Sequence, residues 1–187
     1  MSGAEFHPKV AVTKEDLAKM LERAKPSNLV KLGAQILETD SEDGEHDHLA
    51  AHAIDGDPDT FWHTRWQPRN DPLPHHLTID LGREVTLRGM TYLPRQDMAN
   101  GRIASAEILL SNDPRSWGDP VAKANWRNSD QRQTVEFTQP VTARYLKFVV
   151  TSEVNQNPFA AVAELDVLLD NTTATFFTYA SLDFHGK

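Results

Sequence analysis

The densest group of residues able to carry chemistry is the stretch 53–66, AIDGDPDTFWHTRW. Asp55, Asp57 and Thr60 place hard oxygen atoms within one tight turn, and such oxygens suit Ca²⁺ better than a soft metal. The turn is not an EF-hand loop, because no glutamate stands at its twelfth position. A cation here needs further ligands from elsewhere, for which Glu164 is a candidate. On spacing alone, an Asx-rich turn without a metal is the preferred interpretation.

The end of the same stretch contains residues suited to binding a sugar. Neighbouring residues of an extended segment point in opposite directions, so we expect only one of Trp62 and His63 to be buried, and Trp62 is the predicted core residue. His63, Arg65 and Trp66 are then expected near a loop surface. An exposed indole can stack on sugar C–H groups while imidazole and guanidinium bind hydroxyls. For Trp66, a core position explains the sequence equally well.

Other chemistries find little support. Six of the eight histidines fall in one third of the chain, but they form no HExxH pair, which disfavours a zinc site. There is no GxSxG, P-loop or dinucleotide motif, and the many carboxylates of an acidic chain do not by themselves indicate a glycosidase dyad. The absence of cysteine excludes disulfides, thiol catalysis and cysteine-ligated zinc.

Charge and hydropathy limit the partners. The 187 residues include 27 acidic and 19 basic side chains, a net charge of −8, which argues against nucleic acid or an anionic membrane as the ligand. No apolar run approaches the roughly 20 residues that span a bilayer. The first residues lack the cationic start and apolar stretch of a signal peptide, so no leader is visible in this sequence, and a secreted parent protein stays open as an interpretation.

Residues 13–25, TKEDLAKMLERAK, predict a helix. Thr13 and Asp16 have the spacing of a capping box, and Pro26 ends the pattern. We expect a docked helix or a connector. Its apolar stripe at helical spacing comprises Leu17, Met20, Leu21 and Ala24.

The rest of the chain has the period of strands. Apolar and polar residues alternate at 77–81, 146–150 and 165–169, and the segments 85–93, 105–111 and 133–137 are strand-like in composition. Long polar loops separate these short strands, with no helices between them. This predicts an all-β fold, an antiparallel β-sandwich. The tail 171–187 is either one added strand or a mobile end.

Several runs together resemble a known family: the stretch 53–66, then PLPHHLTIDLG, GMTYLPRQDMANGRI, SWGDPVAKANW and ARYLKFVVTSEVNQNPFAAVAELDV. They are similar to discoidin, or coagulation-factor type C, domains, and within them to family 32 carbohydrate-binding modules. The resemblance covers 31–170. It implies a jelly-roll-like sandwich at 31–170, an extension at 1–30 that contains the helix, and a tail at 171–187.

The resemblance also implies two sites. The family's structural calcium falls on Asp55, Asp57, Thr60 and Glu164, with backbone carbonyls near His52 and Ala163, which makes calcium the better interpretation of the turn. The galactose site of the family falls on His63, Trp66, Arg95, Asn100 and Phe159. The family often adds an acidic residue in its first loop, and that position falls on His46 or its neighbour Glu45.

The implied function is a non-catalytic module that recognises terminal galactose-type sugars and tethers a larger glycan-degrading enzyme, secreted or periplasmic, to its substrate. A discoidin-like module for protein or phospholipid is the main alternative. Acidic and histidine side chains in the equivalent loops, instead of apolar spikes among basic residues, disfavour lipid. A metal-dependent glycan hydrolase is the remaining alternative, and no second cluster of acids supports it.

Overall fold

The computed structural model describes residues 12–23 and 27–170 of the chain. Helix α1 spans Lys14–Arg23, inside the predicted range; residues 24–26 lie outside the described part, as does the tail 171–187. The capping box is confirmed: the Asp16 N–H donates to Thr13 Oγ1 at 3.0 Å, and the Thr13 N–H donates to Asp16 Oδ2 at 2.9 Å. Leu17, Met20 and Leu21 are exposed, so this apolar stripe is not buried against the sandwich.

The remaining elements are short helical turns and antiparallel strands. One sheet has the order β1-β3-β6-β4-β5 with β8 beside β3, and β2 pairs separately with β7. The elements are α2 (Asn28–Leu32), β1 (Gln35–Thr39), the 3-10 helices η1 (Gly44–His46) and η2 (Ala50–Ile54), β2 (Trp62–His63), β3 (His75–Leu93), β4 (Ile103–Ser111), β5 (Ala122–Asn125), β6 (Gln133–Glu153), β7 (Ala161–Val162) and β8 (Glu164–Leu169).

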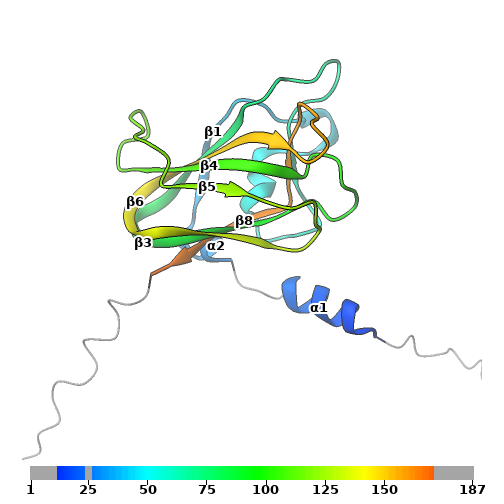
Figure 1. Ribbon diagram of the computed structural model, residues 1–187, viewed down its shortest axis with the longest axis horizontal. Helices are drawn as coiled ribbons and strands as arrows, with labels where there is room; N and C mark the ends of the chain where they lie inside the picture. Colours follow the sequence, from blue (N-terminus) through cyan, green and yellow to red (C-terminus); the bar gives the residue numbers. More distant parts are fainter. Residues whose placement is uncertain (1–11, 24–26, 171–187) are drawn as a thin grey trace, which may run out of the picture.

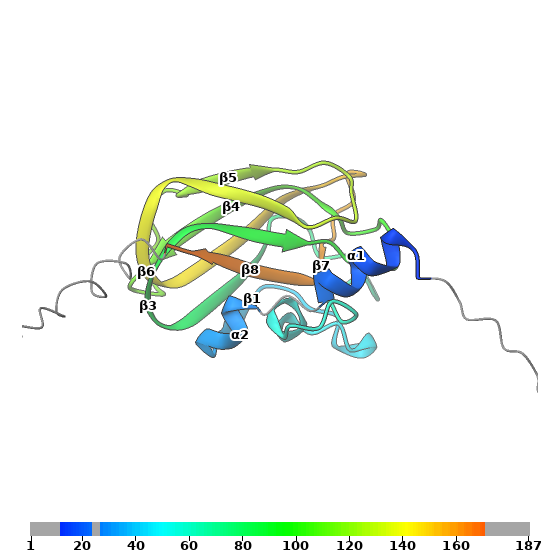
Figure 2. The same cartoon turned by 90° about the horizontal axis from the view of Figure 1, so that it is seen from below.

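Two long bent strands turn this sheet into a sandwich. Residues 75–80 of β3 pair with β1 and the second half of β6, whereas residues 85–92 pair with the first half of β6 and with β8. The register breaks between the two halves, where Gly82 has a φ of +80° that favours glycine. Strands β3 and β6 therefore belong to both layers, as their curvature in Figure 1 shows. Strands β1, β4 and β5 complete one layer and β8 the other (Figure 2).

The predicted alternation lies on the core face of these strands. Trp62 is also fully buried, as predicted, and its Nε1 donates to the Ser41 carbonyl at 2.9 Å. Leu169, the last residue of the predicted pattern, is only partly buried. The all-β sandwich with a short N-terminal helix is thus confirmed. The fully buried alternating residues are Leu77, Ile79, Leu81, Leu146, Phe148, Val150, Leu165 and Val167.

Helix α2 joins the sandwich through β8. The backbone N–H groups of Asn28 and Leu29 donate to Asp166 Oδ1 at 2.8 and 3.0 Å, and Leu29 is buried in the core. Gly33 caps the helix with a φ of +70°. The packed body therefore includes residues from Ser27 onward, slightly before the start of the family resemblance.

Candidate functional site

Backbone pairing fixes His63 in strand β2, between strand β7 on one side and the segment 43–48 on the other. The Asp43 N–H donates to the His63 carbonyl at 2.9 Å, and the His63 N–H donates to the His48 carbonyl at 3.2 Å. The imidazole packs against the Phe159 ring with centroids 5.4 Å apart and is 5% exposed. The expectation that only one of Trp62 and His63 is buried is therefore wrong, because the segment 43–48 and Phe159 cover the outer face of β2.

The His63 ring is held as a neutral hydrogen-bond acceptor. Its Nδ1 lies 2.5 Å from the Thr64 carbonyl, so Nδ1 carries the proton and Nε2 is left with a lone pair. Burial lowers the pKa of His63 and outweighs the Thr64 hydrogen bond, and the positive charge of Arg95 acts in the same direction as burial. At neutral pH the ring can therefore accept a hydrogen bond from a hydroxyl.

Arg95 supplies the complementary donors. Its guanidinium lies over the Phe61 ring, 4.2 Å from the centroid, and donates from Nε and Nη2 to the two carboxylate oxygens of Asp97 at 2.7 and 2.6 Å. These bonds use two of the five guanidinium N–H donors and leave the others for a ligand. Arg95 is only 6% exposed, and its guanidinium contacts both Asp97 and Phe61. Hydrogen bonds from Arg95 lower the pKa of Asp97.

Trp66 forms the solvent-facing part of the cluster. It is 40% exposed, which excludes a core position, and its ring stacks on His46 at 5.4 Å between centroids. Trp66 Nε1 donates to Asp43 Oδ2 at 2.7 Å, and His46 Nδ1 lies 2.9 Å from the same oxygen. Burial alone raises the pKa of Asp43, but the hydrogen bonds from His46 and Trp66 hold it below its ordinary value. Asp43 thus fixes both rings.

Ring contacts join these groups into one surface. His48 lies between the two parts, with its centroid 6.4 Å from His46, 4.1 Å from Phe61 and 6.3 Å from His63. The predicted residues His46, His63, Trp66, Arg95 and Phe159 therefore lie in one continuous cluster, which we call the aromatic cluster together with Asp43, His48, Phe61 and Asp97.

Two predicted residues are not joined to the aromatic cluster by a hydrogen bond or ring contact in the described part of the chain. Asn100 is exposed in the turn before Gly101, whose carbonyl accepts the Ala161 N–H at 2.8 Å, so Asn100 lies beside the β7 end of the site. Glu45 is exposed in η1, and within the described residues its carboxylate forms no hydrogen bond or ion pair. Of the two residues predicted for the first-loop position, His46 makes ring contacts with Trp66 and His48, whereas Glu45 has no such contact among the described residues.

Sequence reasoning missed Asp43, His48, Phe61 and Asp97. Asp97 follows Arg95 at a spacing that allows a fork-like ion pair, and Phe61 directly precedes the predicted Trp62, so weak signals existed for both. Asp43 carried none, because its role depends on the fold of the segment 43–48.

The acidic turn after η2 approaches the start of β8. Thr60 Oγ1 donates to Asp55 Oδ2 at 2.7 Å, and the Gly56 N–H donates to Glu164 Oε1 at 2.8 Å. Burial, and then its neighbour Asp55, raise the pKa of Glu164 to about 9. The Asp57 carboxylate instead accepts the Asp59 N–H at 3.0 Å. Among the described residues, no three histidine or acidic side chains are grouped as metal ligands.

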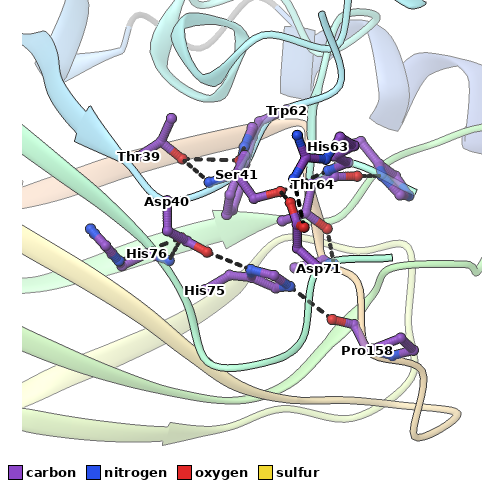
Figure 3. Close-up of polar contacts among 12 residues, drawn as sticks. Thr39, Asp40, Ser41, Trp62, His63, Thr64, Asp71, His75, His76 and Pro158 are labelled. Atoms are coloured by element: carbon purple, nitrogen blue, oxygen red, sulfur yellow. Dashed lines mark hydrogen bonds and ion pairs between the residues drawn. The ribbon is translucent and has the colours of Figure 1, made fainter. Parts of the chain in front are cut away.

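A buried polar network supports the cluster from the side of β1 and β3 (Figure 3). Ser41 Oγ donates to Asp71 Oδ2 at 2.7 Å and accepts the Arg65 N–H at 2.9 Å. Thr64 bonds Ala160 twice at 3.0 Å, its N–H to the Ala160 carbonyl and its Oγ1 from the Ala160 N–H. The loop that carries Phe159 is therefore tied to the strand that carries His63.

The match to a family model identifies the fold family. The F5/8 type C domain model matches residues 37–165. The chain belongs to this family. Solved structures of family 32 carbohydrate-binding modules are similar to it as well, as the sequence predicted. CpGH89CBM32-5 from Clostridium perfringens, in complex with GalNAc-β-1,3-galactose, is 32% identical with a TM-score of 0.67, covering 73% of this chain and 96% of that one. The NanJ module from the same organism, in complex with galactose, is 32% identical with a TM-score of 0.64, covering 72% and 92%.

The curated relatives are much longer proteins. A sialidase of Micromonospora viridifaciens is 40% identical over 134 residues, which are 71% of this F5/8 type C chain and 21% of the sialidase. A galactose oxidase of Gibberella zeae is 42% identical over 118 residues, 62% of this chain and 17% of the oxidase. The chain therefore corresponds to one part of each relative. Across the described residues, no helix has both the length and the apolarity that crossing a membrane requires.

Proposed function

We propose that this chain is a non-catalytic module that binds terminal galactose-type sugars through the aromatic cluster. The observation that carries the proposal is that one cluster holds both a neutral acceptor, His63 Nε2, and the remaining donors of Arg95. Phe159 packs on His63, and the exposed Trp66 ring joins the same cluster through His46 and His48. The sugar complexes of the two similar Clostridium perfringens modules support the same ligand class.

The chemistry fits a galactose-type hydroxyl pattern. A hydroxyl both donates and accepts, so the axial O4 can donate to His63 and accept from Arg95, whose planar fork reaches two adjacent oxygens. The C–H face opposite then lies on Phe159 or Trp66. Asn100, exposed in the turn before Gly101, is the residue that we propose contacts O3 or O4.

Isothermal titration with galactose tests the proposal, with glucose as the comparison because it differs in the configuration at C4. We expect His63→Ala and Arg95→Ala to lose galactose binding while they retain a cooperative melting transition. His76→Ala and Arg88→Ala are matched controls, since Arg88 pairs with Glu136 on the exposed face of the sheet. Unchanged isotherms for both site variants, or equal affinity for glucose, would remove these residues from sugar recognition.

We also propose that the turn 55–60 and Glu164 hold a structural Ca²⁺. Its support is the approach of two carboxylates, Asp55 and buried Glu164: burial, and then Asp55, raise the pKa of Glu164 despite the opposing charge of Arg132. A hard cation would relieve this repulsion. Thr60 supplies a further oxygen, and Asp57, whose carboxylate accepts the Asp59 N–H, is the remaining proposed ligand. The ion would supply charge neutralisation and fix this turn against β8.

Thermal melting with calcium and with excess chelator tests this metal. At 100 times the dissociation constant the ion adds about 2.7 kcal/mol, or roughly 5–10 °C in Tm for a chain of this size. We expect Glu164→Gln to remove the response and Glu136→Gln, on the exposed sheet face, to retain it. An equal Tm with calcium and with chelator would count against a structural ion.

The context we propose is a larger exported glycan-active protein, in which this module supplies attachment and another part supplies catalysis. The enzyme names of the relatives, of which the chain spans about a fifth, support this context. Incubation of the chain with galactosides should release no free sugar, and measurable turnover would overturn the non-catalytic assignment.

A further inference from the structure

His75 is a fully buried histidine whose two ring nitrogens both face acceptors. Its Nδ1 lies 2.7 Å from Asp40 Oδ2 and its Nε2 lies 2.8 Å from the Pro158 carbonyl, as Figure 3 shows. A carboxylate and a carbonyl can only accept, so both nitrogens must donate. A neutral imidazole has one N–H, and the arrangement therefore requires the imidazolium.

The charges around the ring favour this protonated form. Burial disfavours the cation, but the hydrogen bonds to Asp40 and to the Pro158 carbonyl outweigh burial and raise the pKa of His75. The charge of Asp71 acts in the same direction. The neighbouring His76 is the other histidine beside Asp40, and burial, with a smaller effect from the charge of His75, lowers its pKa. Burial also opposes ionisation of Asp40, yet its bonds to His75 and to the His76 N–H hold its pKa below the ordinary value.

Pro158 directly precedes Phe159, the ring that packs on His63. On the other side of Phe159, Ala160 is held by its two bonds to Thr64. The start of the loop is held by Glu153, whose Oε2 accepts the Asn155 and Asn157 N–H groups. Among these attachments, the bond to Pro158 is the one that depends on the protonation of a histidine.

We propose that the His75 imidazolium is a positioning residue of the sugar site: it holds the Pro158 carbonyl and thereby sets Phe159 against His63. This inference rests on the proposed function. When the ring loses a proton, Nδ1 keeps its bond to the charged Asp40, and Nε2 becomes an acceptor facing the Pro158 carbonyl. The loop then loses its attachment beside Phe159.

The sign of the pH effect follows from the raised pKa of His75. The attachment is present at and below the ordinary histidine value of about 6.5 and is lost as the pH rises through the higher value of the folded protein. Burial lowers the pKa values of His48 and His63, so their titrations fall on the acid side of this value. The alkaline loss is therefore separate from theirs.

Galactose titrations across pH 5.5–9.5 test the proposal on the wild-type chain, His75→Gln and His76→Gln. We expect wild-type affinity to fall roughly tenfold toward the alkaline end, as the loss of one charge-assisted hydrogen bond predicts. His75→Gln, with an uncharged donor, should bind weakly with little pH dependence. His76→Gln is the matched control, because His76 lies beside Asp40 without contacting Pro158, and it should follow the wild type.

Imidazole ¹⁵N spectra of the wild-type chain give a second measurement that needs no variant to fold. At pH 7 both nitrogens of His75 should carry protons, and the Phe159–His63 ring contact should weaken as they titrate at higher pH. A neutral His75 at pH 7, or constant galactose affinity through its titration, overturns the proposal. If no galactose binds at any pH, the proposed function fails, and the Phe159–His63 contact still decides the role of His75.

Discussion

At the scale of single residues, the site achieves its polarity by burying charged and titratable groups with partners already in place. Arg95 is nearly inaccessible, and the Asp97 carboxylate and the Phe61 ring compensate for the water that it loses. His63 is buried without a carboxylate on its ring, so it stays neutral. A donor group and an acceptor group are therefore held in the same cluster before a ligand arrives, which lowers the ordering cost of binding.

The two bonds from Arg95 predict a role for Asp97, which sequence reasoning missed. Asp97→Ala removes both anchoring bonds of the Arg95 guanidinium, and we expect galactose affinity to fall by about tenfold because the fork loses its direction. Asp113→Ala is the matched control, since Asp113 bonds Arg115 at the same sequence spacing on an exposed loop. Calorimetric titration of both variants measures the difference. A loss of affinity that is equal in the two variants would contradict the anchoring role.

At the scale of elements, the sequence predicts the strands that are long enough to show an alternation of apolar and polar residues. Long alternating segments, such as 77–81 and 146–150, were located because every second side chain had to be apolar. Strands β2 and β7 have two residues each, which is too short to show an alternating pattern. The sequence therefore does not predict the β2–β7 strand pair that holds His63. The burial of His63 is missed for a related reason, because it depends on His48 and Phe159, which come from distant parts of the chain.

The sequence predicts those site residues that lie at the spacings of a known motif. It misses those whose position depends only on how a loop folds. His63, Trp66, Arg95 and Phe159 sit at spacings that the family resemblance carries, and the structure joins them in one cluster. Asp43 joins Trp66 and His46 only because the segment 43–48 folds back along β2. Local sequence carries no signal for such a return.

The pairing of β3 with β6 yields a prediction at this scale. Gly89 lies at a register break, and a Cβ there would stand 2.5 Å from the Val135 carbonyl oxygen. Gly89→Ala must separate the two strands, so we expect a loss of about 1–3 kcal/mol in the free energy of unfolding. Gly118→Ala is the control, because a Cβ at Gly118 meets nothing within 4 Å. Denaturant titration measures the free energy of unfolding of both variants. Equal stability of the two variants would contradict the close approach of Gly89 to the Val135 carbonyl.

At the scale of the whole molecule, a net charge of −8 accompanies a site for which we propose a neutral, galactose-type ligand. Long-range attraction therefore contributes little, and affinity must come from a few hydrogen bonds and ring contacts. Three or four such bonds with stacking give on the order of −4 to −6 kcal/mol, a dissociation constant of roughly 1 mM to tens of μM. Weak and reversible binding at one such site is sufficient for a module whose role is to keep an attached protein near a surface rich in glycan.

Weak binding at a single site predicts a large gain from linking two copies. Two copies of the chain joined by a flexible linker should bind a surface dense in galactose ends about 10²–10⁴ times more tightly than one copy, since the second contact becomes intramolecular. Surface plasmon resonance on such a surface measures the ratio. A linked pair that carries His63→Ala in one copy should return to the single-copy affinity.

Binding of the single chain should persist in roughly 0.5 M salt, because screening does not weaken contacts with a neutral sugar. A steep loss of binding as the salt concentration rises would instead indicate a charged ligand.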